Sequence, residues 1–169
     1  MANATVKDLR AKSDAAWANL TRQLQGMEPH MDRSDAPGQW TTRQVLAHLL
    51  GEPGRKPVDF LKKFSRHDLP VSETSPGQSN VPPERQKMTL KQLLDALNAQ
   101  RREVLEYLEG LSEADLQGRK ARIPFLKQFL GTDEIALAQF SGLLFDGHWN
   151  DHAGQLAKIR KAVGLPDAK

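Results

Sequence analysis

The chain has 169 residues, of which 38% are hydrophobic and 27% are charged, and its formal net charge is +3. This length and composition are typical of one globular domain, which we expect to span residues 1–169, with a core that needs no cross-links. Because the sequence contains no cysteine, disulfides, cysteine-ligated zinc and a thiol nucleophile from the chain itself are excluded.

Charge and hydropathy favour a cytoplasmic protein without nucleic-acid or membrane partners. The basic residues are spread along the chain rather than clustered with aromatic residues, so nucleic-acid binding is not indicated. The polar segment 1–14 does not resemble a signal peptide. The most apolar stretch, residues 135–145, is interrupted by Gln139, Ser141 and Gly142 and is too short to span a membrane.

Two helices are predicted in the first part of the chain. Apolar residues recur at spacings of three and four from about Thr5 to Met27, which predicts one amphipathic helix. Thr41 and Gln44 have the spacing of a capping box that opens a second helix. This second helix places His48 on its inward face, and the glycines and prolines of residues 51–57 interrupt it.

A long polar connection, residues 66–87, separates the second helix from the third. Roughly 22 residues at about 3.3 Å each can return along a whole helix. We therefore expect a crossover, with the second and third helices parallel. Thr89 and Gln92 form another capping box, and the third helix is predicted to run to about Glu109.

The fourth helix is predicted from about Asp133, after an N-cap at Thr132, to Val163. The chain shows no strand-like alternation of any length, so the pattern predicts an all-α four-helix bundle. On the inward face of this helix, His148 and His152 are four residues apart. Their imidazoles should therefore lie one above the other.

Three histidines are thus predicted to face one interior: His48, His148 and His152. Neutral imidazoles suit a divalent ion, zinc and nickel above all, and three protein ligands with open positions are typical of a catalytic site. The alternative is that the pair on the fourth helix is an ordinary part of the core. The spacing also matches the ends of the zinc-peptidase motif His-Glu-x-x-His, but Trp149 occupies the position of the glutamate, which disfavours a peptidase.

Five further residues are candidates for lining a pocket or supporting the ligands: Trp40, Asp146, Trp149, Asn150 and Gln155. A carboxylate beside the ligands could accept a hydrogen bond from an imidazole N–H. For the two tryptophans, a core or dimer-interface role is equally compatible with the sequence. No catalytic residue beyond the metal ligands is indicated.

The segments Trp40–Leu49 and His148–Leu156 together resemble the DinB-like (DinB/YfiT) superfamily of metal-binding bundles. The resemblance extends from the first helix to the C-terminus. It implies an up-down-down-up four-helix bundle with a long crossover between helices two and three, a divalent metal held by the three histidines, and a homodimer. Characterised members include thiol-dependent isomerases and thiol S-transferases. The interrupted second helix departs from the continuous helix usual in the family.

The residues and the resemblance lead to one functional expectation and one alternative. We expect a metal-dependent enzyme of the thiol-dependent transferase or isomerase type, or of the hydrolase type, acting on a small-molecule substrate. Its nucleophile would be water or a low-molecular-weight thiol brought in as a cofactor, because the chain has no cysteine. The alternative is a non-catalytic metal-containing module, either stress-associated or binding.

Overall fold

The computed structural model describes residues 3–73 and 77–168. Most of these residues are helical, as the sequence predicts. The elements, in chain order, are α1 (Ala4–Leu24), the 3₁₀ turn η1 (Glu28–His30), α2 (Thr42–Leu50), α3 (Pro57–Leu61), α4 (Pro83–Lys87), α5 (Leu90–Glu109), α6 (Glu113–Gly118), β1 (Lys120–Arg122), the 3₁₀ turn η2 (Pro124–Leu126), α7 (Lys127–Leu130), β2 (Glu134–Ala136), α8 (Leu137–Gly142), the π-helical η3 (Leu143–Trp149) and α9 (Asn150–Ala162).

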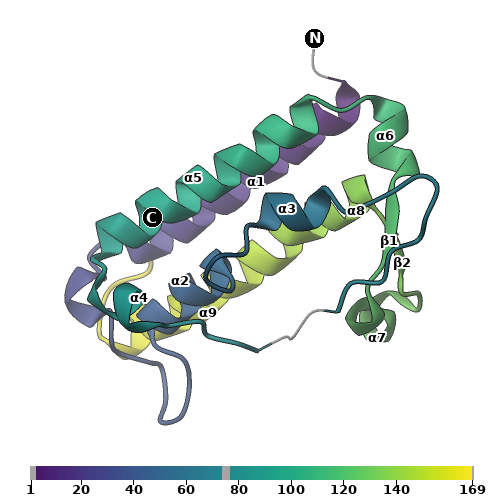
Figure 1. Ribbon diagram of the computed structural model, residues 1–169. Helices are drawn as coiled ribbons and strands as arrows, with labels where there is room; N and C mark the ends of the chain where they lie inside the picture. The colour runs from purple at the N-terminus through teal and green to yellow at the C-terminus, as the bar shows by residue number, and fades with distance from the viewer. Residues whose placement is uncertain (1–2, 74–76, 169) are drawn as a thin grey trace.

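Four rods form the bundle: α1, α2 with α3, α5, and the continuous run α8–η3–α9 (Figure 1). Arg43, near the start of α2, donates a hydrogen bond of 2.6 Å to the carbonyl of Met88, just before α5. Lys56, just before α3, pairs with Glu103 in the later part of α5. The α2–α3 rod and α5 therefore run in the same direction, and the connection between them returns along the bundle. In Figure 1, α1 and α8–η3–α9 run the opposite way.

The boundaries of α2 and α5 follow from their capping residues, as predicted. Both helices open with a complete capping box, in which the threonine side chain accepts from the backbone N–H three residues on and the glutamine side chain accepts from the threonine N–H. Gly51 ends α2 with φ of 75°, a conformation that a residue with a Cβ adopts only with strain. The predicted interruption of the second helix is confirmed, because α3 starts only at Pro57.

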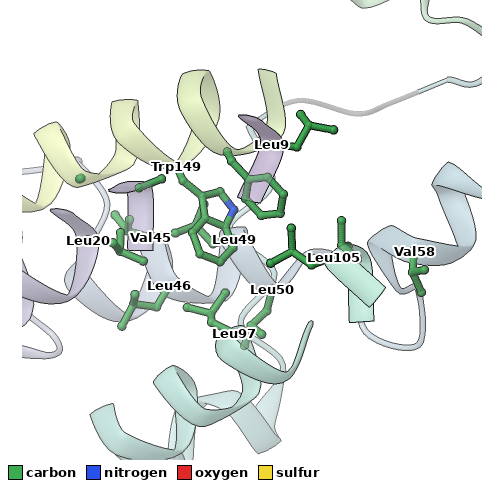
Figure 2. Packing of buried hydrophobic residues seen from close by; sticks show 14 of the residues in the cluster. Leu9, Leu20, Val45, Leu46, Leu49, Leu50, Val58, Leu97, Leu105 and Trp149 are labelled. Carbon is green, nitrogen blue, oxygen red and sulfur yellow. The ribbon is translucent and has the colours of Figure 1, made fainter. Parts of the chain in front are cut away.

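The hydrophobic core lies along the centre of the four rods. Figure 2 shows leucine and valine side chains of α1, α2 and α5 around the indole of Trp149, which projects inward from η3, with Val58 of α3 farther away. Only 2% of the Trp149 side chain is exposed. Its ring also lies 5.6 Å from that of Phe145 and 6.1 Å from that of Trp17 on α1. This burial ties the fourth rod to the other three beside the predicted ligands.

The start of the fourth rod differs from the prediction. Thr132 does not cap a helix; its hydroxyl accepts a hydrogen bond from the N–H of Glu134 only two residues on. Residues Glu134–Ala136 form β2, which pairs antiparallel with β1. Ile135 lies opposite Ala121 in this pair, and both are 1% exposed. The predicted helix start at Asp133 and the predicted absence of any strand are therefore wrong, because burial of Ile135 favours the extended pairing, and the helix begins at Leu137.

The middle of the fourth rod is π-helical rather than α-helical over residues 143–149. A π-helix bonds each N–H to the carbonyl five residues back, so its turns are wider than those of an α-helix. In this stretch Trp149 is fully buried, and His148, which was predicted to face inward, is half-buried.

Among residues 3–73 and 77–168, no helix combines the length and the apolar character needed to cross a lipid bilayer.

Candidate metal centre

The fold brings His48, His148 and His152 together. His48 comes from α2, His148 from the π-helical η3 and His152 from α9. The Nε2 atom of His148 lies 2.9 Å from Nε2 of His48 and 3.2 Å from Nε2 of His152. One ring nitrogen from each histidine can be chosen so that all three lie within 4.8 Å of one another. The predicted convergence is therefore present in the structure, on two rods that are far apart in the sequence.

Local structure explains how each imidazole reaches this point. The capping box at Thr41 fixes the start of α2, and Gly51 ends the helix three residues after His48. The wide turns of η3 bury Trp149 among the rods while His148 turns toward α2. His148 and His152 remain four residues apart and their ring centroids are 4.7 Å apart.

Hydrogen bonds at Nδ1 fix two of the three tautomers. Nδ1 of His48 lies 2.6 Å from the carbonyl oxygen of Gln78, and Nδ1 of His152 lies 2.9 Å from Oε1 of Gln155. Because an oxygen of this kind only accepts, each Nδ1 carries the proton and donates it. A neutral imidazole protonated at Nδ1 has a lone pair at Nε2. Both Nε2 lone pairs therefore point toward His148.

The surroundings of His48 and His148 favour uncharged imidazoles. Burial above all, together with the neighbouring His152 and His48, lowers the pKa of His148 from 6.5 to about 3. Burial also lowers the pKa of His48, an effect that the Gln78 carbonyl opposes and His152 reinforces. Lone pairs crowded at 2.9 and 3.2 Å repel one another unless a proton or a cation lies between them. Neutral, converging nitrogen donors are what a divalent transition metal requires, so these residues fit such an ion.

Two of the five other candidate residues also lie at this cluster. The indole of Trp40 lies 4.9 Å from the ring of His48 and is stacked, at 8° and 6.1 Å, with the ring of His152. Gln155, one turn after His152, accepts the hydrogen bond from its Nδ1. Trp40 thus covers one side of the imidazoles, and Gln155 orients one of them.

The structure places the other three candidates elsewhere. Trp149 belongs to the core. Asn150 bonds the Asp146 carbonyl through its Nδ2 and accepts from Asn19 of α1 through its Oδ1. Asp146 is exposed and lines an open groove between α1 and the α8–η3 segment. These three residues face α1 or solvent because the helix turns them away from the side that carries His148 and His152.

The carbonyl of Gln78 is the contact that the sequence did not indicate. It comes from the crossover, thirty residues after His48. A backbone carbonyl has no sequence signature, since every residue carries one. The only local signal is Asn80, two residues on, which adopts a positive φ of 54° and belongs to a residue type that tolerates this conformation.

The chain is similar to known proteins over most of its length. A family model described as the DinB superfamily matches residues 4–156. Among solved structures, the fold is similar to that of YfiT from Bacillus subtilis, described as a probable metal-dependent hydrolase with an unusual four-helix bundle topology. The TM-score is 0.71 and the identity 17%, over 95% of this chain and 89% of that one. No curated protein matches the sequence. At this identity the likeness shows the fold, and it confirms the predicted four-helix bundle.

Proposed function

Since the chain belongs to the DinB superfamily, we propose that it is a metal-dependent enzyme whose divalent ion is held by His48, His148 and His152. The convergence of the three Nε2 atoms from two rods carries this proposal. Three protein ligands leave coordination positions open for a reactant, which distinguishes catalytic from purely structural sites.

The chain's own residues prepare the site before any ion binds. The Gln78 carbonyl and the Gln155 amide oxygen hold two imidazoles in the tautomer that presents Nε2. The Trp40 ring packs against His48 and His152 and limits water on that side. Among the described residues, no carboxylate joins the three histidines as a fourth ligand.

A divalent ion in this setting supplies Lewis acidity, which lowers the pKa of a nucleophile brought to it. Because the chain has no cysteine, the nucleophile is water or an exogenous low-molecular-weight thiol. The first gives a hydrolase and the second a transferase or isomerase, each acting on a small-molecule substrate. The description of the YfiT structure as a probable hydrolase supports the first.

A peptidase of the His-Glu-x-x-His type is not supported. That mechanism requires a glutamate between the two histidines as the general base. Here the residue is Trp149, and its indole is 2% exposed in the core. Another exposed acid near the ion would have to take that role, and Asp146 faces the groove beside α1 instead.

We propose zinc or nickel as the ion, because imidazole ligands favour both. Untagged protein, loaded with a mixture of divalent metals and then desalted, should retain close to one ion per chain by elemental analysis. Tag-free protein matters because a nickel column would itself supply metal. Retention of no stoichiometric metal would contradict the site.

The proposed enzymatic activity can be tested by measuring whether the protein catalyses the reaction of an electrophile with a thiol or with water. Metal-loaded protein would be incubated with glutathione and 1-chloro-2,4-dinitrobenzene, and separately with activated esters and amides. Metal-dependent consumption that His148→Ala abolishes supports the enzyme and identifies the nucleophile. Stoichiometric metal without turnover across both panels would favour the alternative, a non-catalytic metal-containing module. The homodimer implied by the family resemblance and the cytoplasmic location expected from the sequence stay predictions, the first testable by light scattering.

A further inference from the structure

The crossover between α3 and α5 touches a proposed metal ligand. The carbonyl oxygen of Gln78 accepts the hydrogen bond of His48 Nδ1 at 2.6 Å. The residue Gln78 itself is exposed, so burial of its own side chain does not hold it in place. Something else in the crossover must therefore fix this carbonyl against the imidazole.

Asn80 supplies the first part of that support. Its backbone has a φ of 54°, which turns the chain sharply just after Gln78. Its side-chain Nδ2 donates to the Gln78 carbonyl at 3.3 Å, the same oxygen that His48 uses. Its own carbonyl accepts a hydrogen bond of 2.9 Å from Nη1 of Arg85. Asn80 thus links the Gln78 carbonyl to Arg85.

Arg85, on the short helix α4, supplies the second part. Besides Asn80, its Nη1 donates to the carbonyls of Ala47 (3.0 Å) and Gly51 (2.5 Å) at the C-terminal end of α2. A cation is favoured there because the last carbonyls of a helix are unsatisfied and carry partial negative charge. Burial lowers the pKa of Arg85, and its described partners are carbonyl oxygens. The guanidinium joins the crossover to the residues on either side of His48.

A second arginine, on α2, forms further hydrogen bonds to α4 and to the residue that follows it. Nη1 of Arg43, on α2, donates to the carbonyl of Arg85 at 3.2 Å and to that of Met88 at 2.6 Å. Nε of Arg43 pairs with Asp32 at 2.8 Å. Residue Arg85 of α4 is therefore bonded to both ends of α2: its carbonyl accepts from Arg43 near the start, and its side chain donates to Ala47 and Gly51 near the end.

We propose that Arg85, acting through Asn80, is a positioning residue for the metal ligand His48. It holds the Gln78 carbonyl where it fixes the His48 tautomer and aims Nε2 at the ion. Partners that orient a ligating histidine typically contribute a factor of about ten to a hundred in metal affinity. Because coupling is reciprocal, an ion at the three histidines must in turn stabilise the ordered crossover. This inference rests on the proposed metal site.

The test measures metal binding without reference to activity. Arg85→Met removes the donors at similar length, and Lys87→Met, an exposed residue on the same helix, is the matched control for lost charge. Cobalt and zinc affinities would be measured by titration, with the cobalt absorption spectrum as the readout of ligand geometry. We expect Arg85→Met to weaken both metals about tenfold and to alter the cobalt spectrum, and Lys87→Met to leave both unchanged.

Asn80 gives a second, independent pair of variants. Asn80→Gly keeps the positive φ accessible and removes only the bond to the Gln78 carbonyl, whereas Asn80→Ala also strains the turn. The loss of affinity should therefore be larger for alanine. Hydrogen exchange completes the test: metal should slow exchange of residues 77–82 in the parent protein and not in Arg85→Met, with α5 as the internal reference.

The outcomes separate this inference from the proposed function. A parent protein that binds no metal overturns both. A parent that binds metal, while folded Arg85→Met and Asn80→Ala keep its affinity and cobalt spectrum, overturns only the positioning role and leaves Arg85 as a clamp of the fold. Metal-dependent protection of residues 77–82 that is lost in Arg85→Met supports the coupling, because a clamp independent of the ion would not respond to it.

Discussion

Replacing the histidines one at a time distinguishes a metal site from ordinary core packing. At a metal concentration a hundred times the Kd, binding to the folded state adds about 2.7 kcal/mol to the free energy of unfolding. For a chain of this size each kcal/mol corresponds to about 2–4 °C, so metal should raise the Tm of the parent by roughly 5–10 °C.

The loss of metal-induced stabilisation expected in each histidine variant can be estimated from the contribution of a ligand to metal affinity. Residues that merely support a ligand already contribute a factor of about ten to a hundred in affinity, so removing a ligand should cost at least about a hundredfold. At the same metal concentration the increment then falls to about 0.4 kcal/mol. His148→Ala, His152→Ala and His48→Ala should all lose it together, because their Nε2 atoms form one cluster.

The metal-free variants decide between the two explanations. Alanine at His148 removes a group whose lone pair is crowded by two others, so we expect a change in the unfolding free energy of within about 1 kcal/mol. A core-packing role instead predicts a loss of about 2–5 kcal/mol, as for other large buried side chains. The assay is urea denaturation and thermal melting, each with and without zinc. His67→Ala, at an exposed position, is the control that should keep the full increment.

A large metal-free loss in all three variants, with no response of the parent to metal, would refute the reasoning. The histidines would then be packing residues, and the proposed enzyme would fall with the site. A response of the parent that His67→Ala also abolishes would place the ion elsewhere.

Three further predictions follow from single residues. The folded-state pKa of His148 is lowered from 6.5 to about 3, so between these two pH values the imidazole is protonated in the unfolded chain and neutral in the folded one. The metal-free protein should therefore lose stability as the pH falls from about 6.5 toward 3. Urea titrations at pH 7 and 4.5 should show a smaller loss of unfolding free energy for His148→Ala than for the parent. Gly51→Ala should destabilise by about 1–3 kcal/mol because φ is 75° there, whereas Gly154→Ala, in open space on α9, should stabilise by up to about 1 kcal/mol in the same urea assay. Gln155→Leu should weaken zinc about tenfold by titration, since His152 Nδ1 loses its acceptor; unchanged affinity would show that Gln155 does not orient the ligand.

Much of the fold was predictable because its signals are local. The capping boxes at Thr41 and Thr89 depend only on residues three apart, and both helices begin where these boxes place them. His48 follows the first box at a fixed distance, so its inward position was predictable too. The same holds for the pair His148 and His152, whose four-residue spacing keeps them adjacent in the helix.

The remainder depends on contacts that no short window contains. Nothing near Ile135 shows that Ala121 will pair with it and replace a helical turn by a strand. The π-helical turns of η3 and the burial of Trp149 depend on packing against α1 and α2. The Gln78 carbonyl depends on where the whole crossover comes to rest. The histidines and the side chains of Trp40 and Gln155 beside them could therefore be predicted, and the Gln78 carbonyl could not.

The wide turns of η3 also limit how this site could be transplanted or redesigned. Each residue of a regular helix advances about 100° around the axis, so a π-helical stretch leaves the segments before and after it out of phase. The fourth rod can thus pack against β2 and α6 through α8, and against α2 through α9. A His-x-x-x-His copied onto an ideal helix would inherit the spacing and lose this phase. Deleting one residue within 143–147 should likewise remove this phase difference here. The segment up to Phe145 would then be rotated about the helix axis relative to the imidazoles. Engineering of the site should treat the seven residues of η3, which include His148, as one unit with His152 on α9.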